Sequence, residues 1–279
     1  MGGPWLRLMV GEAVSLMRGT MKLPLYQVDA FTGRLFGGNP AAVVLLEDWL
    51  SDETLAAIAA ENNLAETAFV IPRTGVVPLR WFTPAVEVDL CGHATLASAH
   101  VLLRHNFPER DMVVFSTRSG NLSVTRDGDL LNMNFPSRPG KPVEVSDALG
   151  SALGATPREA FMARDLMAVF DSEADVRNLR PDFQRVAALD AFAVIATAPG
   201  DEMDFVSRFF APRAGIPEDP VTGSAHCTLV PYWSARMGKV RLHALQVSAR
   251  GGELYCEHRG DRVVIGGRTV EYLRGEISL

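Results

Sequence analysis

The sequence predicts an α+β protein made of two similar lobes, and three observations support this fold class. From Leu23 onward, short strand-like apolar segments are mixed with only a few helical ones. The segment RWFTPAVEVDLCGHATLA at 80–97 resembles RFFAPRAGIPEDPVTGSAHCTL at 208–229. Each copy runs from a strand through a proline, an acidic loop and a glycine into a helix of small residues. We therefore expect two lobes with a common plan, each enclosing one helix.

The first elements of the chain are two strands and a helix with recognisable ends. Tyr26–Phe31 alternates like a strand, and 37–46 combines a glycine-rich turn with an apolar strand. A helix is predicted from Ser51 to Asn63, because serine is a good N-cap and the Asn-Asn pair suits a helix end. Its apolar face would consist of Leu55, Ile58 and Ala59.

The next long element is a helix that the fold should enclose. The segment from Gly92 to Leu103 is small or apolar almost all round, so other elements must cover most of its surface. PSRPGKP at 136–142 indicates a linker or a boundary between lobes. The remaining strands are predicted at 66–71, 79–82, 112–116, 121–126, 130–135, 191–197 and 208–210.

This pattern divides the chain into an extension and two lobes. We interpret residues 1–20 as an N-terminal extension, because Arg7 and Glu12 interrupt its apolar stretch and argue against a signal peptide. The N-terminal lobe is expected to span 21–135, with 266–279 returning to it. The C-terminal lobe is expected to span 136–265.

Composition excludes several function classes. The net charge is −6 and the basic residues are scattered, which argues against a nucleic-acid-binding surface. No segment approaches the roughly 18 continuous apolar residues of a membrane-spanning helix. The three cysteines are widely spaced and form no disulfide framework, which favours a reducing cytoplasm. No nucleotide-binding loop occurs, and the few lysines give little support for a pyridoxal cofactor, so no cofactor is expected.

Two helix starts are candidate anion-binding sites. Gly92-His93 and Gly223-Ser224 would each present unpaired backbone N–H groups and the positive end of a helix dipole. If the lobes pack face to face, both ends could hold one small carboxylate. Each start could also be an ordinary helix beginning with small residues, and the internal repeat is what favours a site.

Three side chains could perform acid/base chemistry beside these helix starts. Glu66 lies at the mouth of an apolar strand, where a carboxylate can be partly desolvated and still reach a cleft, although a simple rim position fits as well. Asp219 lies between Pro217 and Pro220, which stiffen the backbone around it. His93 could relay a proton or donate a hydrogen bond, or it could merely pair with a carboxylate such as Asp89.

Other chemistries fit the sequence poorly. Gly223-Ser224 lacks the G-x-S-x-G elbow of a serine hydrolase. Cys91-x-His93 together with His226-Cys227 supplies zinc-binding atoms without a known ligand spacing, so no metal site is expected.

Five ordered motifs resemble the phenazine-biosynthesis PhzF-like family. They are Gln27-Val-Asp-Ala-Phe31, Gly38-Asn-Pro-Ala-Ala-Val43, Asn63-Leu-Ala-Glu-Thr67, Cys91-Gly-His-Ala-Thr95 and Glu218-Asp-Pro-Val-Thr-Gly-Ser-Ala-His226. The resemblance implies a diaminopimelate-epimerase-like fold, in which each lobe wraps a mostly antiparallel, barrel-like sheet around a central helix. It also implies a cofactor-free isomerase that is usually a homodimer.

The resemblance further implies roles for individual residues. Glu66 would be the base, assisted by His93 and Asp219, while Gly92, Gly223 and Ser224 would bind the substrate. Where the founding member often has serine before the catalytic glutamate, this chain has Ala65, so one possible hydrogen bond to the substrate is missing.

Two alternatives to this isomerase remain open. Related epimerases use two cysteines as bases, and Cys91 matches the first of these positions. The second falls near Asp219-Pro220, where no thiol exists, so cysteine-assisted racemisation of an amino acid is the weaker reading. A non-catalytic member that binds a small molecule or a protein is the other alternative.

Overall fold

The computed structural model describes residues 21–279, and the extension interpreted at 1–20 lies outside the described residues. The helical elements are α1 (Asp52–Asn62), α2 (Gly92–Val101), η1 (Leu102–Asn106), α3 (Asp147–Leu153), α4 (Glu173–Asn178), α5 (Phe183–Ala188), η2 (Pro212–Ala214), η3 (Gly223–Ala225) and α6 (His226–Met237). The strands of the N-terminal half are β1 (Lys22–Ala30), β2 (Asn39–Leu45), β3 (Glu66–Val70), β4 (Val76–Phe82), β5 (Glu87–Val88), β6 (Met112–Thr117), β7 (Gly120–Asp127) and β8 (Leu130–Pro136). The remaining strands are β9 (Lys141–Val143), β10 (Glu159–Met162), β11 (Leu166–Val169), β12 (Val194–Pro199), β13 (Phe205–Ala211), β14 (Ile216–Asp219), β15 (Arg241–Gln246), β16 (Gly252–Arg259), β17 (Arg262–Gly267) and β18 (Thr269–Ser278).

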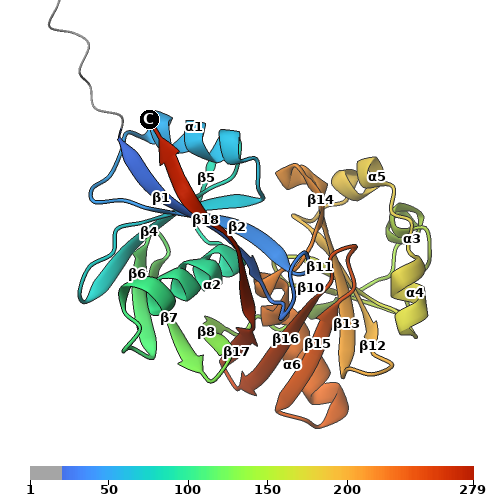
Figure 1. Cartoon of the computed structure of the whole chain (residues 1–279). Coiled ribbons are helices and arrows are strands. Elements are labelled where there is room, and N and C mark those ends of the chain that lie inside the picture. Colours follow the sequence, from blue (N-terminus) through green and yellow to red (C-terminus); the bar gives the residue numbers. More distant parts are fainter. Residues whose placement is uncertain (1–20) are drawn as a thin grey trace, which may run out of the picture.

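One ladder of strands runs through the first lobe. In space its order is β18–β1–β2–β3–β4–β6–β7–β8, with β5 added beside β4. Only the β2–β3 and β4–β6 pairs are parallel. Figure 1 shows β18, from the late part of the sequence, lying beside β1, from its early part.

The second lobe repeats this plan. Its strands follow the order β9–β10–β11–β12–β13–β15–β16–β17, with β14 beside β13. The parallel pairs, β11–β12 and β13–β15, occupy the same places as their counterparts in the first lobe. An antiparallel β8–β17 pair joins the two ladders. The topology therefore confirms the two-lobed α+β fold that the sequence repeat predicts.

Each lobe encloses one of the two predicted helices. The sheet wraps around α2, which packs against β1, β2, β3, β7, β8 and β18. Because α2 is surrounded in this way, eight of its residues are buried: His93, Ala94, Thr95, Leu96, Ala97, Ser98, Ala99 and Val101. In the second lobe α6 packs against β15, β16 and β17 (Figure 1). Both enclosed helices are therefore confirmed.

The short helix α1 forms as its end residues predict. The hydroxyl of Ser51 accepts a hydrogen bond from Thr54 N, and Asn63 ends the helix in the left-handed conformation. Its buried face consists of Leu55, Ile58 and Ala59, as predicted. The predicted helix at 92–103 differs at its end, because the α-helix stops at Val101 and a π-helical turn continues to Asn106.

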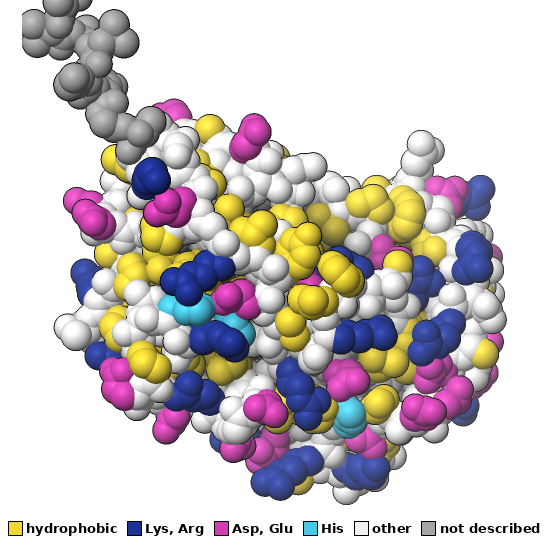
Figure 2. All heavy atoms as spheres, in the orientation of Figure 1, with side chains coloured by type: hydrophobic (Ala, Val, Ile, Leu, Met, Phe, Trp, Pro, Cys, Tyr) yellow, Lys and Arg dark blue, Asp and Glu magenta, His cyan; other side chains and the backbone are white. Residues whose placement is uncertain are grey.

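Charged side chains of both signs are interspersed on the surface. On the face drawn in Figure 2, Lys and Arg side chains alternate with Asp and Glu. This mixed surface provides no single extended basic patch on that face. Among residues 21–279, no helix is long and apolar enough to cross a membrane.

Candidate active site

A cavity of about 520 Å³ lies between the two lobes. Its lining includes the six residues selected from the sequence: Glu66, Gly92, His93, Asp219, Gly223 and Ser224. The two repeat glycines face each other across it, since a methyl group added at Gly92 would lie 3.9 Å from the Cα of Gly223. The prediction that these glycines share a cleft is confirmed.

Glu66 enters this cavity from the first position of β3. That strand is parallel to β2, with Glu66 aligned to Ala41, and all five residues of β3 are buried. The Glu66 side chain lies beside the N-terminus of α2, where its Oε2 is 3.0 Å from Nε2 of His93. Oε2 accepts no well-aligned hydrogen bond from the described residues, so its lone pairs remain available to a bound molecule.

His93 pairs with Glu66, and not with Asp89 as one reading of the sequence had it. Burial lowers the pKa of His93, whereas the negative charge of Glu66 acts to raise it. Burial also raises the pKa of the Cys91 thiol, which is therefore neutral near pH 7. Glu66 is then the carboxylate that faces Nε2 of the His93 ring.

Asp219 reaches the same cavity from the second lobe, at the end of β14. Its Oδ1 accepts a hydrogen bond from Asn39 Nδ2 at 2.8 Å, and its Oδ2 accepts one from the Thr222 hydroxyl. Burial raises the pKa of Asp219 to about 6, although these two hydrogen bonds oppose the rise. At pH 7 this carboxylate is mostly ionised, and each of its oxygens accepts one hydrogen bond.

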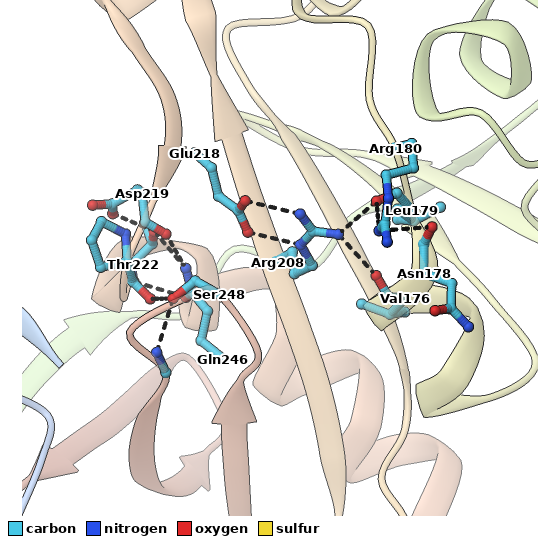
Figure 3. Close-up of polar contacts among 12 residues, drawn as sticks. Val176, Asn178, Leu179, Arg180, Arg208, Glu218, Asp219, Thr222, Gln246 and Ser248 are labelled. Carbon is cyan, nitrogen blue, oxygen red and sulfur yellow. Dashed lines mark hydrogen bonds and ion pairs between the residues drawn. The ribbon is translucent and has the colours of Figure 1, made fainter. Parts of the chain in front are cut away.

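The loop after β14 is held by side chains from its own lobe (Figure 3). Gln246 accepts from the backbone N–H of Thr222 at 2.8 Å and donates to the carbonyl of Asp219 at 2.8 Å. The Ser248 hydroxyl donates to Pro220 O at 2.7 Å. Just before the loop, the guanidinium of Arg208 donates hydrogen bonds to both carboxylate oxygens of Glu218. The acidic pair 218–219 thus divides into one structural carboxylate and one that faces the cavity.

Asn39 is the site residue that sequence reasoning missed. It begins β2 and is completely buried. Its Nδ2 lies 2.8 Å from Asp219 Oδ1, 2.9 Å from Val221 O and 3.2 Å from His93 Nδ1. Asn39 therefore connects the two lobes at the acid/base group. The only signal in the sequence was the Asn39-Pro40 pair in the motif 38–43. That pair does not by itself indicate a catalytic role.

A turn before β2 fixes the position of Asn39. Gly38 has φ +63°, and a Cβ there would lie 2.1 Å from Ala30 O, so only glycine fits. From the second lobe, Arg250 donates to the carbonyls of Gly37 and Gly38 and to the buried carboxylate of Asp29. This clamp holds the turn against the second lobe.

Three donor atoms near the cavity could also approach a metal ion. Atoms of Glu66, Cys91 and His93 all lie within 4.8 Å of one another. A metal would require the Cys91 thiolate, which burial disfavours. His226, which we also considered from the sequence, instead donates from Nδ1 to Thr222 O at 2.9 Å, and Cys227 is outside this cluster. The arrangement favours proton chemistry over metal binding.

Two arginines line the mouth of the cavity, one from each lobe. Nη2 of Arg118 lies 2.8 Å from Oε2 of Glu87 in an ion pair. The guanidinium carbon of Arg164 lies 4.7 Å from the centre of the Phe192 ring. These cations provide positive charge at the entrance of an acidic protein.

Known proteins resemble this chain over nearly all of the described residues. The phenazine biosynthesis-like protein family, PhzC-PhzF, matches residues 28–275. An uncharacterized isomerase of Pseudomonas aeruginosa is 51% identical over 259 residues, covering 93% of this chain and 100% of that relative. The crystal structure of a PhzF-family phenazine biosynthesis protein from Enterococcus faecalis superimposes with a TM-score of 0.91 at 45% identity, covering 93% and 100% of the two chains.

More distant structures extend the likeness of fold alone. A hydroxyproline epimerase from Agrobacterium vitis has a TM-score of 0.59 at 13% identity, with 92% of this chain and 93% of that one covered. The two-lobed fold is thus the diaminopimelate-epimerase-like one. The chain belongs to the phenazine biosynthesis-like protein family and is an enzyme of the isomerase type.

Proposed function

We propose that this protein is a cofactor-independent isomerase that moves a proton within a small carboxylate substrate. The observation that carries the proposal is the meeting of Glu66 and His93 from one lobe with Asp219 from the other, in a single cavity. An ionisable pair at 3.0 Å beside a buried carboxylate is the kind of group that general acid/base catalysis requires.

In this mechanism Glu66 is the base. Its carboxylate removes a proton from one carbon of the substrate, and the electron pair left behind is delocalised into an adjacent unsaturated or carboxyl group. The protonated Glu66 then returns the proton to another carbon, so substrate and product contain the same atoms. The poor alignment of the 3.0 Å contact with His93 is compatible with this role, because catalytic hydrogen bonds often tighten only when substrate binds.

The substrate carboxylate would bind at the facing glycines. The N-terminus of α2 at Gly92 supplies backbone N–H groups and the positive end of a helix dipole. Gly223 and the partly exposed Ser224 approach from the second lobe, where backbone and hydroxyl groups could complete the anion site. Arg118 and Arg164 would attract the anion to the mouth of the cavity.

Glu66→Gln is the direct test of the base. The substitution keeps the shape of the side chain but removes its basicity, so turnover should fall by roughly 100-fold or more while binding is retained. Turnover is measured by NMR in D₂O as deuterium incorporation and product formation, once a screen of small carboxylates has identified a substrate. Glu61→Gln, on the exposed side of α1, is the matched control and should keep full activity. Wild-type turnover in Glu66→Gln would remove Glu66 from the mechanism.

Cysteine-assisted racemisation is the second candidate, and one contact favours it. Sγ of Cys91 lies 3.5 Å from Nδ1 of His93 inside the same cavity. A two-thiol mechanism would need a second cysteine on the opposite face of the substrate, but Cys227 lies on α6 and is not among the residues that line the cavity. The assembled acid/base group also disfavours a purely binding role.

We also propose that the protein is a homodimer. The ring centroids of Phe36 and Tyr272 lie 5.8 Å apart, and these side chains are 68% and 49% exposed. An exposed aromatic pair of this kind is suited to contact with a second copy of the chain. Light scattering should give a mass twice the 30.3 kDa of the chain. A mass of one chain at micromolar concentration would contradict this proposal.

A further inference from the structure

The amide of Asn39 has only one workable orientation. Its nitrogen lies 2.8 Å from a carboxylate oxygen of Asp219 and 2.9 Å from the carbonyl oxygen of Val221. Both neighbours are acceptors, so placing the amide oxygen there would set three oxygens against one another. The NH₂ group must face them, which leaves the amide oxygen of Asn39 buried with no hydrogen-bond partner among residues 21–279.

This orientation restricts the proton on His93. Nδ1 of the imidazole lies 3.2 Å from the same NH₂ group, which can only donate. A hydrogen on Nδ1 would point at another donor, whereas a lone pair on Nδ1 can share one of the amide hydrogens. The ring proton then resides on Nε2, the nitrogen that faces Glu66 at 3.0 Å.

We propose that Asn39 is a positioning residue that keeps His93 in the neutral Nε2–H tautomer, so that Glu66 works as a free base and is not neutralised by an imidazolium. Asn39 itself touches no reacting atom. Its catalytic consequence rests on the proposed function, but the tautomer of His93 does not.

The groups around His93 act against this restraint. Glu66 on β3 and Asp219 on β14 carry negative charge toward the ring, and Sγ of Cys91 lies 3.5 Å from Nδ1 as a weak alternative acceptor. These neighbours favour an imidazolium with both nitrogens protonated. A cationic His93 would bind the Glu66 carboxylate as an ion pair and weaken it as a base. Asn39 opposes this outcome by contact, because it supplies a donor where the imidazolium needs an acceptor.

The protonation state of His93 can be measured without a substrate. Nitrogen-15 NMR of the imidazole rings, with the His93 signals assigned from the His93→Gln protein, should show wild-type His93 protonated on Nε2 alone between pH 6 and 8. Asn39→Ser removes the donor facing Nδ1, and Asn39→Asp replaces it with an acceptor. In both variants we expect His93 to become doubly protonated at pH 7. Asn62→Ser is the control, because it removes an amide hydrogen bond to Thr67, next to Glu66, without touching His93.

Catalysis supplies an independent readout for the positioning role. Once a substrate is available, kcat of Asn39→Ser should fall roughly tenfold with KM nearly unchanged, and the pH at which activity appears should rise. A doubly protonated His93 in the wild-type protein at pH 7 would overturn the inference even if neither variant folds. An unchanged His93 signal in a folded Asn39→Ser protein would do so as well. If His93 is neutral but the Glu66→Gln protein keeps wild-type turnover, the tautomer assignment stands and only the proposed function is rejected.

Discussion

Asp219 is a buried carboxylate whose protonation is linked to folding. Burial raises its pKa from the ordinary 3.8 to about 6. Between about pH 4 and pH 6 the folded state therefore holds a proton that the unfolded state has released. The free energy of unfolding falls as the pH rises through this window, by on the order of 3 kcal/mol.

Asp219→Asn should remove this contribution. The stability of the variant relative to wild type should rise from pH 4 to pH 7 by as much as about 3 kcal/mol, because an amide has no charge to bury. Its turnover should nevertheless fall and its ligand affinity change, since the contact with Asn39 is altered. Urea unfolding at the two pH values measures the difference. The exposed Asp171→Asn is the control, and a pH-independent difference for Asp219→Asn would contradict the prediction.

The role of individual residues was only partly predictable from the sequence. Glu66, His93 and Asp219 were selected because their types and local settings suit proton chemistry, and the structure places them together. The partners were not predictable. Asn39 lies 180 positions from Asp219 in the chain, and its importance depends on a hydrogen bond that forms only when the lobes pack.

At the scale of elements, the turn between β1 and β2 depends on a charge from the other lobe. Asp29 is 2% exposed, and its carboxylate accepts hydrogen bonds from Phe36 N and from Arg250. Burial raises the pKa of Asp29, while these two donors act to lower it. Arg250 therefore stabilises the ionised carboxylate as well as the backbone that leads into Asn39.

Arg250→Met should destabilise the protein by about 2–3 kcal/mol near pH 8, because it leaves a buried carboxylate without its cation. The variant should lose less stability at pH 5, since removal of Arg250 raises the pKa of Asp29 further and protonation relieves the buried charge. Chemical unfolding at both pH values tests this. Adding Asp29→Asn to the variant should restore part of the loss at pH 8. Arg259→Met, which removes an exposed pair with Glu257, should change stability little.

Elements with strong local signals formed as the sequence predicts. Helix α1 has both of its caps, and α2 is enclosed because it lacks a polar face. The predicted end of this helix at Leu103 was wrong, since α2 ends at Val101 and a π-helical turn begins at Leu102. No local residue pattern marked that change of helix type.

At the scale of the whole molecule, the anionic substrate that we propose would enter a protein of net charge −6. Arg118 and Arg164 are the cations at the entrance, and Arg164 makes no ion pair within residues 21–279. Because both guanidinium groups are exposed, each should contribute modestly and in a salt-dependent way.

Arg164→Met should weaken sulfate binding by up to about fivefold at low salt and change it little at about 200 mM NaCl. Calorimetry at the two salt concentrations measures this, with Arg158→Met as the control because Arg158 is exposed outside the cavity and pairs with Asp171. Equal losses at both salt concentrations would indicate a direct contact with the anion in place of long-range attraction.

The repeat in the sequence predicted two similar lobes, but it did not predict which strands join them. The β8–β17 pair joins residues more than a hundred positions apart, and no short motif specifies such a partner. Long-range pairing of this kind is set by how whole sheets close, which local propensity does not encode.

The pairing of β1 with β18 has a consequence for synthesis on the ribosome. One of the two neighbours of β1 is Thr269–Ser278, and the hydrogen-bonded residues Lys22 and Glu276 lie 254 positions apart in the chain. Until β18 has been synthesised, one edge of β1 exposes unpaired backbone groups that could pair with another nascent chain. The first lobe therefore cannot complete its sheet before the strands of the second lobe have been synthesised, so the two lobes should reach the native state together.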